Sequence, residues 1–212
     1  MTPIYFISGI GADERAFRLI QLPGYEIRNI SWVPPLKNET LKSYSIRLSS
    51  QIKTEDPIII GLSFGGIVAQ EIANHVGAKK VIIVSSLKNR KELPLLYKIA
   101  ATIRLNRIIP AFFFKKSTFI TNIFFGAKGQ TDKMLLKNIL HSTDTKFLQW
   151  AIENVLHWNP ETSLEITHIH GSKDKIIPIR YVKPDYVIIG GGHLMVLNKA
   201  RELSALLMQV LK

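Results

Sequence analysis

Short apolar runs alternate with segments of helical periodicity along both ends of the chain. Six runs bounded by turn or charged residues predict strands, at residues 3–8, 25–32, 57–62, 79–86, 164–171 and 185–192. Helical spacing of apolar residues follows at residues 14–21, where Asp13 is a candidate cap, and at 41–52, 64–75 and 203–211. Strands that alternate with helices predict an α/β fold, with a mostly parallel six-stranded sheet and helices on both faces.

The segment 88–160 interrupts this alternation. It contains no clear strand, and stretches such as DKMLLKNIL and TKFLQWAIENVLHW predict helices, while AFFFKK and FITNIFF make it rich in Phe. The segment is too apolar for a disordered linker. We therefore predict a helical cap over 88–160, inserted after the fourth strand, and a core domain made of 1–87 and 161–212.

Composition places the chain among soluble globular proteins, with 46% hydrophobic and 21% charged residues over a length of 212. The longest stretch without a charged side chain, residues 57–70, is shorter than the roughly 20 apolar residues of a spanning helix. The first residues lack the basic region of a signal peptide. Because the chain has no Cys, disulfides and thiolate metal sites are excluded. We expect a cytoplasmic protein.

The net charge of +12 is concentrated in the predicted cap, where 12 Lys or Arg face four acids and leave +8. Three interpretations stay open. The cap is a solvated surface whose Phe side chains pack on the core, or it lines an acyl pocket whose rim attracts anionic substrates, or it contacts an acidic membrane or nucleic acid. The third interpretation is the weakest, because the basic residues form no single stripe, so we expect no nucleic-acid partner and no membrane contact.

The motif GLSFG (residues 61–65) lies between an apolar strand and a helical pattern, and it fits the G-x-S-x-G nucleophile elbow. In such an elbow Ser63 sits on a strained turn with its hydroxyl above the sheet, and Gly61 and Gly65 avoid crowding it. The helix N-terminus offers N–H groups to a developing oxyanion. A glycine-rich turn with a bystander serine would give the same letters, but the flanking strand and helix favour Ser63 as a nucleophile.

A serine hydroxyl needs a base, and His193 is the best placed of six histidines. It follows IIGGG just beyond the last predicted strand, at the sheet edge where open parallel sheets bind ligands. Of the other histidines, His75 ends a helix at the opposite edge of the sheet. His141 and His157 lie in the predicted cap. His168 and His170 alternate within a predicted strand, which suggests packed or surface residues.

Asp174 is the candidate acid that orients the base and stabilises its imidazolium form. It lies in the loop GSKDKIIP, after the fifth predicted strand. The loop after the fourth strand, SSLKN, contains no carboxylate, which favours Asp174. Asp144 and Glu153 are weaker candidates.

The loop SGIGADE after the first strand should supply a second oxyanion donor. We predict the backbone N–H of Ile10, paired with that of Phe64, because Gly9 and Gly11 let the main chain approach a substrate closely. A tight turn without this role is the alternative. A dinucleotide-binding G-x-G-x-x-G is disfavoured, because Glu14 stands where a small residue is needed. We expect no cofactor and no metal.

In this order, GLSFGG, GSKDKIIP and GGGH resemble the motifs of the α/β-hydrolase fold family, over residues 3–87 and 162–211. The resemblance implies hydrolysis through an acyl-serine intermediate without a cofactor. Many relatives have His-Gly where this chain has Ser8-Gly9. That departure leaves the backbone donor in place but prevents transfer of a substrate from the His-Gly subgroup.

We therefore expect a serine hydrolase that cleaves a small or medium acyl ester or thioester. A lyase or C–C hydrolase with the same three residues is one alternative, and a non-catalytic ligand-binding protein is another. A pure binder has no need of Ser, Asp and His together at strand ends. The sequence determines neither the substrate nor the oligomeric state.

Overall fold

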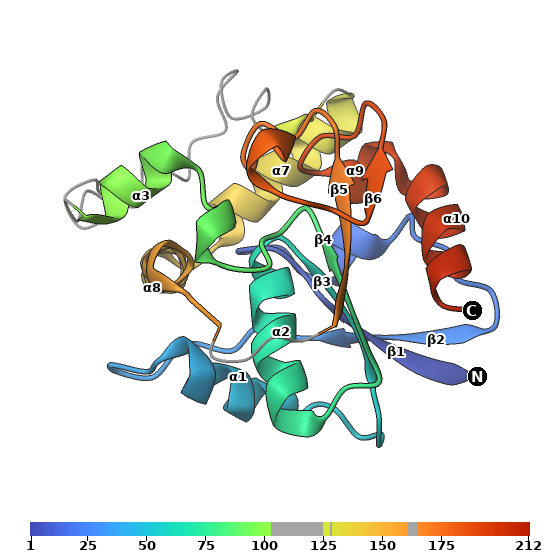
Figure 1. Cartoon of the computed structure of the whole chain (residues 1–212), viewed down its shortest axis with the longest axis horizontal. Helices are drawn as coiled ribbons and strands as arrows, with labels where there is room; N and C mark the ends of the chain where they lie inside the picture. The colour runs from blue at the N-terminus through green and yellow to red at the C-terminus, as the bar shows by residue number, and fades with distance from the viewer. Residues whose placement is uncertain (103–124, 128, 161–164) are drawn as a thin grey trace.

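Six parallel strands form a single sheet at the centre of the molecule (Figure 1). The computed structural model describes residues 1–102, 125–127, 129–160 and 165–212, so AFFFKK and most of FITNIFF lie outside the described residues. The sheet order is β2-β1-β3-β4-β5-β6. The strands are β1 (Thr2–Ile7), β2 (Tyr25–Ile30), β3 (Ile58–Leu62), β4 (Lys80–Val84), β5 (Ile166–Gly171) and β6 (Tyr186–Ile188). The predicted parallel six-stranded sheet is confirmed.

Each face of the sheet is covered by an apolar cluster. Ile4 and Phe6 of β1 point into one cluster, and the alternate residues Tyr5 and Ile7 point into the other. The Tyr5 face is covered by α1 (Leu41–Ser49) and α2 (Phe64–Val76). The Ile4 face is covered by the short 3₁₀ helix η1 (Glu14–Phe17), α9 (Met195–Asn198) and α10 (Ala200–Val210). Because both faces are buried, β3 is apolar throughout, as predicted.

The described residues between β4 and β5 are mostly helical, as predicted. After η2 (Arg90–Glu92) they contain α3 (Leu95–Thr102), α7 (Gln130–Ser142) and α8 (Thr145–His157). In Figure 1 these helices lie on the side of the sheet away from both chain termini. Leu136 of α7 joins the cluster on the Ile4 face, and Phe147 of α8 joins the cluster on the Tyr5 face. The insertion is thus anchored in both apolar layers. Residues 161–164, the predicted start of the second core segment, lie outside the described residues.

Several predicted elements differ from the structure at their ends, and three of these differences have a clear backbone cause. The helix expected over 14–21 is only the 3₁₀ turn η1. The chain turns after Phe17 and then enters β2, and the Phe17 carbonyl accepts the N–H of Ile20 in that turn. The fourth strand ends at Val84 rather than residue 86, since Ser85 has a φ of 49°. The last strand ends at Ile188 rather than residue 192, and Gly190 follows with a φ of 74°.

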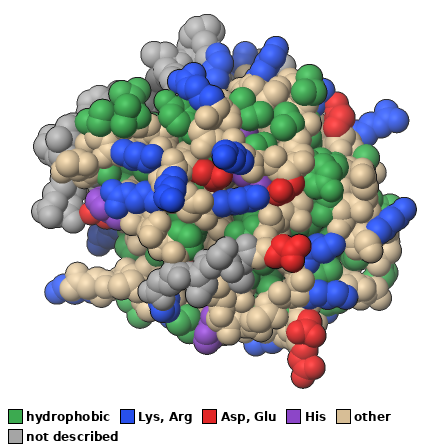
Figure 2. All heavy atoms as spheres, in the orientation of Figure 1, with side chains coloured by type: hydrophobic (Ala, Val, Ile, Leu, Met, Phe, Trp, Pro, Cys, Tyr) green, Lys and Arg blue, Asp and Glu red, His purple; other side chains and the backbone are tan. Residues whose placement is uncertain are grey.

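The surface carries many Lys and Arg side chains, with Asp and Glu among them and exposed apolar side chains beside them (Figure 2). The described basic residues of the insertion include five that face solvent: Arg90, Lys91, Lys133, Lys137 and Lys146. These five charges are therefore solvated. No helix within the described ranges has the length and apolar character needed to cross a membrane.

Candidate active site

Ser63 occupies a strained turn between β3 and α2. Its φ of 55° and ψ of −121° lie outside the regions that non-glycine residues normally adopt, at a cost of about 1–3 kcal/mol. The turn is held from both sides. The N–H of Ser63 donates to Val84 O at 2.8 Å, and its carbonyl accepts the N–H of Gly66 at 2.9 Å and the hydroxyl of Ser86 at 2.7 Å. The predicted elbow geometry is present.

The two glycines that flank Ser63 allow the start of α2 to lie directly on the sheet. A Cβ built on Gly65 would lie 2.7 Å from the carbonyl carbon of Ile7, and still closer to the carbonyl oxygens of Ile7 and Ser8. A Cβ on Gly61 would lie 2.5 Å from Cα of Gly66. Real Cβ atoms do not make such contacts. Glycine is therefore required at both positions, for the steric reason that the sequence suggested.

Ser63, His193 and Asp174 form one row of hydrogen bonds. His193 Nε2 lies 2.9 Å from Ser63 Oγ, and His193 Nδ1 lies 2.8 Å from Asp174 Oδ2. The three residues follow β3, β6 and β5, so they meet at the carboxyl edge of the sheet. Ser63 follows β3, which pairs with β1 where the strand order reverses, and open parallel sheets bind ligands at such a point. The structure brings the three residues together.

Asp174 is held by more than the imidazole. Its Oδ1 accepts the N–H groups of Ile176 and Ile177, each at 2.9 Å. Burial alone would raise the pKa of the Asp174 carboxyl, but His193 and the Ile177 N–H outweigh it and hold that pKa below its ordinary value. The carboxylate is thus ionised at neutral pH and only accepts hydrogen bonds. His193 Nδ1 is then the donor to that carboxylate, and in the neutral imidazole this tautomer turns the Nε2 lone pair toward Ser63.

Two further histidines lie behind Asp174. His170 Nε2 lies 3.5 Å from Asp174 Oδ2 and 2.8 Å from the Ile177 carbonyl, and its Nδ1 lies 3.1 Å from His168 Nε2. Both side chains are fully buried, and burial lowers the pKa of both, that of His168 to about 3. The sequence suggested packed or surface residues, and they are packed. In the sequence, only their position on the strand that precedes Asp174 indicated that His170 could contact this carboxylate.

The loop after β1 lies against the nucleophile candidate. A Cβ built on Gly9 would lie 3.6 Å from Cβ of Ser63. Ala12 N donates to Gly9 O at 3.1 Å and closes the turn around Ile10. Phe64 is the first residue of α2, a position whose N–H has no acceptor within its helix. The loop that carries Ile10 and the helix start that carries Phe64 thus both adjoin Ser63, and their role as oxyanion donors stays a prediction.

The insertion reaches this site at two points. The first is Gly11, where an added Cβ would lie 2.7 Å from Cβ of Thr143, the residue that follows α7. The second is Phe125, whose ring centroid lies 5.7 Å from that of His193 and whose carbonyl accepts the N–H of Leu194 at 3.1 Å. Side chains of the insertion therefore border both the predicted oxyanion loop and the candidate base.

The weaker sequence candidates have other partners. Asp144 caps α8 by accepting the N–H of Phe147 at 2.8 Å, and a Glu153 carboxylate oxygen lies 3.9 Å from His157 Nδ1. His75 is exposed in the last turn of α2. No group of three or more His, Asp or Glu side chains in the described part of the chain is placed to hold a metal ion.

The sequence matches no protein-family model, and no curated protein sequence matches it. Solved structures do resemble this one. A hydrolase from Oleispira antarctica is 14% identical with a TM-score of 0.76, and the match covers 99% of this chain and 90% of that one. An esterase from Exiguobacterium antarcticum is 13% identical with a TM-score of 0.70 (99% and 91% covered). An N-acyl homoserine lactonase complexed with N-hexanoyl homoserine is 17% identical with a TM-score of 0.69 (99% and 88% covered). The chain therefore has the α/β-hydrolase fold.

Proposed function

We propose that this protein is a serine hydrolase that cleaves a small or medium acyl ester or thioester. The observation that carries the proposal is the row of hydrogen bonds from Ser63 through His193 to Asp174, on a strained turn at the carboxyl edge of the sheet. Solved structures of the same fold that are described as an esterase and a lactonase support an acyl substrate.

Ser63 is the nucleophile and His193 the base in this proposal. Ser63 Oγ attacks the acyl carbon while His193 Nε2 takes the hydroxyl proton, which gives a tetrahedral oxyanion. His193 then returns that proton to the leaving alcohol or thiol as the bond to it breaks, and an acyl-serine remains. Water, deprotonated by the same nitrogen, releases the acid and restores Ser63. Asp174 stabilises the transient imidazolium, which its low pKa supports.

The oxyanion is held by the backbone N–H groups of Ile10 and Phe64 in this proposal. The closeness of Gly9 to Ser63 and the position of Phe64 at the start of α2 support the assignment. Loss of one such donor costs other hydrolases about 10²- to 10³-fold in kcat. We also propose that 88–160 is a cap that lines the acyl or alcohol side of the site, supported by the positions of Phe125 and Thr143.

Hydrolysis of a panel of p-nitrophenyl esters and acyl thioesters of graded chain length tests the proposal. Ser63→Ala should lower kcat by about 10⁴-fold or more, because the nucleophile acts as a unit with its base. The matched control is Ser45→Ala. Ser45 carries a buried hydroxyl on α1 with no hydrogen-bond partner among the described residues, so its loss should leave activity unchanged.

A fluorophosphonate probe separates the proposal from its alternatives. Labelling of the wild-type protein that disappears in Ser63→Ala supports an activated serine. An unlabelled wild-type protein would favour a ligand-binding protein instead. Turnover that persists in Ser63→Ala would show that another residue is the nucleophile. A labelled serine without turnover of any ester or thioester would favour a lyase or C–C hydrolase.

A further inference from the structure

Trp32, just beyond β2, donates its indole N–H toward the loop after β1. Trp32 Nε1 lies 3.0 Å from Ser8 Oγ and 3.2 Å from the Gly9 carbonyl oxygen. The Ser8 hydroxyl donates its proton to the Ala12 carbonyl, so it is free to accept from Trp32. The indole and the Ser8 hydroxyl therefore tie both ends of the turn that contains Ile10.

The Gly9 carbonyl belongs to the same peptide unit as the Ile10 N–H. The unit is planar and trans, so its N–H points opposite to its C=O. Two donors hold that carbonyl, Ala12 N at 3.1 Å and Trp32 Nε1 at 3.2 Å. Rotation of the peptide plane would break both bonds. The indole thus helps to fix the direction of the Ile10 N–H through its hydrogen bond to the Gly9 carbonyl of the same peptide unit.

The same indole packs on the residue that carries the other donor. The rings of Trp32 and Phe64 are stacked, with centroids 5.5 Å apart and planes 25° apart. Phe147 of α8 packs on Trp32 as well, with a centroid distance of 5.4 Å. One side chain therefore contacts the backbone of the Ile10 turn and the side chain of Phe64.

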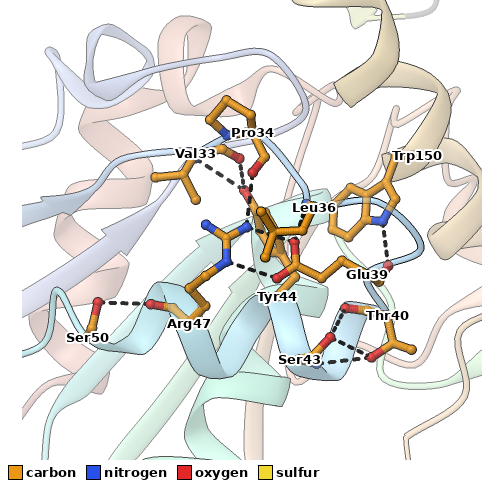
Figure 3. Close-up of polar contacts among 10 residues, drawn as sticks. All are labelled: Val33, Pro34, Leu36, Glu39, Thr40, Ser43, Tyr44, Arg47, Ser50 and Trp150. Carbon is orange, nitrogen blue, oxygen red and sulfur yellow. Dashed lines mark hydrogen bonds and ion pairs between the residues drawn. The ribbon is translucent and has the colours of Figure 1, made fainter.

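The chain after Trp32 is itself fixed to α1, as Figure 3 shows. Tyr44 accepts the Val33 N–H at 3.3 Å and donates to the Val33 carbonyl at 2.8 Å. Arg47 donates to the Pro34 carbonyl at 3.0 Å and pairs with both carboxylate oxygens of Glu39. The carbonyl of Glu39 accepts the indole N–H of Trp150 on α8 at 2.8 Å. Trp32 thus projects from an anchored segment.

We infer that Trp32 is a positioning residue, whose indole N–H orients the Gly9–Ile10 peptide so that the Ile10 N–H stabilises the oxyanion. This inference rests on the proposed function. Ser8 takes part by accepting the same N–H. Trp32 acts through Ile10 and does not touch the substrate in this assignment.

Trp32→Phe removes the donor and keeps an aromatic ring on Phe64. We expect kcat to fall about 10- to 100-fold, below the effect of losing a whole oxyanion donor, and KM to stay within about two-fold. Binding of a trifluoromethyl ketone, whose adduct with Ser63 carries an oxyanion, should weaken by the same factor as kcat/KM. A purely structural role would lower stability without this selective loss. The control is Trp158→Phe, which removes an indole N–H bonded to Glu71 at 2.7 Å, away from the site.

An unchanged kcat in Trp32→Phe, with turnover that still depends on Ser63, would overturn the inference and leave the proposed function intact. A wild-type protein without Ser63-dependent turnover would overturn both. If Trp32→Phe does not fold, benzothienylalanine at position 32 replaces the indole N–H by sulfur and preserves the ring shape. That variant should show the same loss of kcat, and wild-type kcat in it would equally refute the role.

Discussion

The close packing of α2 on the sheet leads to a quantitative prediction for Gly65→Ala. The added Cβ would lie 2.7 Å from the carbonyl carbon of Ile7, whereas an ordinary contact begins at 3.4 Å. The two must therefore separate by at least about 0.7 Å, and the carbonyl oxygens of Ile7 and Ser8, which lie closer still, must move further. The obstacle is backbone on both sides, because β1 is paired with both β2 and β3.

Two effects of opposite sign set the size of the change. Overpacking against a fixed backbone costs about 1–3 kcal/mol, and we take the upper end because neither neighbour can rotate away. Alanine favours the helix over glycine by about 1 kcal/mol, which offsets part of this. The free energy of unfolding should thus fall by about 2 kcal/mol. Because Ser63 begins the same turn, its displacement should lower kcat/KM by up to about 100-fold.

Urea unfolding and ester hydrolysis measure the two effects on the same preparation. Gly129→Ala is the matched control, since Gly129 precedes α7 with a φ of −84° and a Cβ there would meet nothing within 4 Å. Its unfolding free energy should fall by about 1 kcal/mol at most, because alanine is a poorer helix N-cap than glycine. A Gly65→Ala protein with wild-type stability and wild-type kcat/KM would refute the steric account of the elbow.

Gly9→Ala should separate activity from stability: its Cβ would make ordinary contacts, 3.6 Å to Ser63 Cβ and 3.8 Å to Leu62 O, so unfolding should change by less than about 0.5 kcal/mol. The methyl would stand beside Ser63, the proposed nucleophile, so kcat/KM should fall about ten-fold or more. A loss of kcat/KM that is matched by an equal loss of unfolding free energy would contradict this reasoning. Another prediction concerns pH. The pKa of His168 in the folded chain, about 3, lies below the ordinary 6.5, so the unfolded chain binds the proton more readily. The free energy of unfolding therefore falls as the pH drops from about 6.5 toward 3. Between pH 7 and pH 5 this histidine should lower the free energy of unfolding by about 2 kcal/mol. In urea unfolding, the stability of His168→Gln should therefore fall by about 2 kcal/mol less than that of the wild type over this range. An unchanged pH dependence would show that His168 is not buried and neutral.

The order of the strands' apolar runs predicted the sheet well, because strands buried on both faces leave a strong signal. The strand Ile58–Leu62 is fully buried, and the predicted strand began only one residue too early. Strand ends were predicted less well, since they depend on single backbone angles. Ser85 ends β4 through a φ of 49° that its residue type does not suggest. The length of the helix at η1 was overestimated for a related reason. The local spacing of apolar residues does not indicate the bend of the chain that leads into β2.

The candidate site was predictable where residue type and strand end coincide. Ser63, Asp174 and His193 each follow a strand, and parallel strands bring those positions to one edge. Trp32 was missed because its contact depends on register. Ile7 pairs with Ile30, and only that pairing places an indole two residues further on beside Ser8. No pattern within either segment encodes the alignment, and Ser86, which supports the Ser63 carbonyl, was missed for the same reason.

The site is assembled from two halves of the chain, since Ser63 and His193 are 130 residues apart and the insertion lies between them. The two halves are joined through the pairing of β4 with β5, at Val81 with Ile166 onward. Closing a longer loop costs little, about 0.6 kcal/mol for each doubling of its length. The intervening segment can therefore lengthen, shorten or be exchanged at small entropic cost to the pairing that assembles the site. Selection can thus reshape the insertion that borders the candidate site while Ser63, Asp174 and His193 stay unchanged.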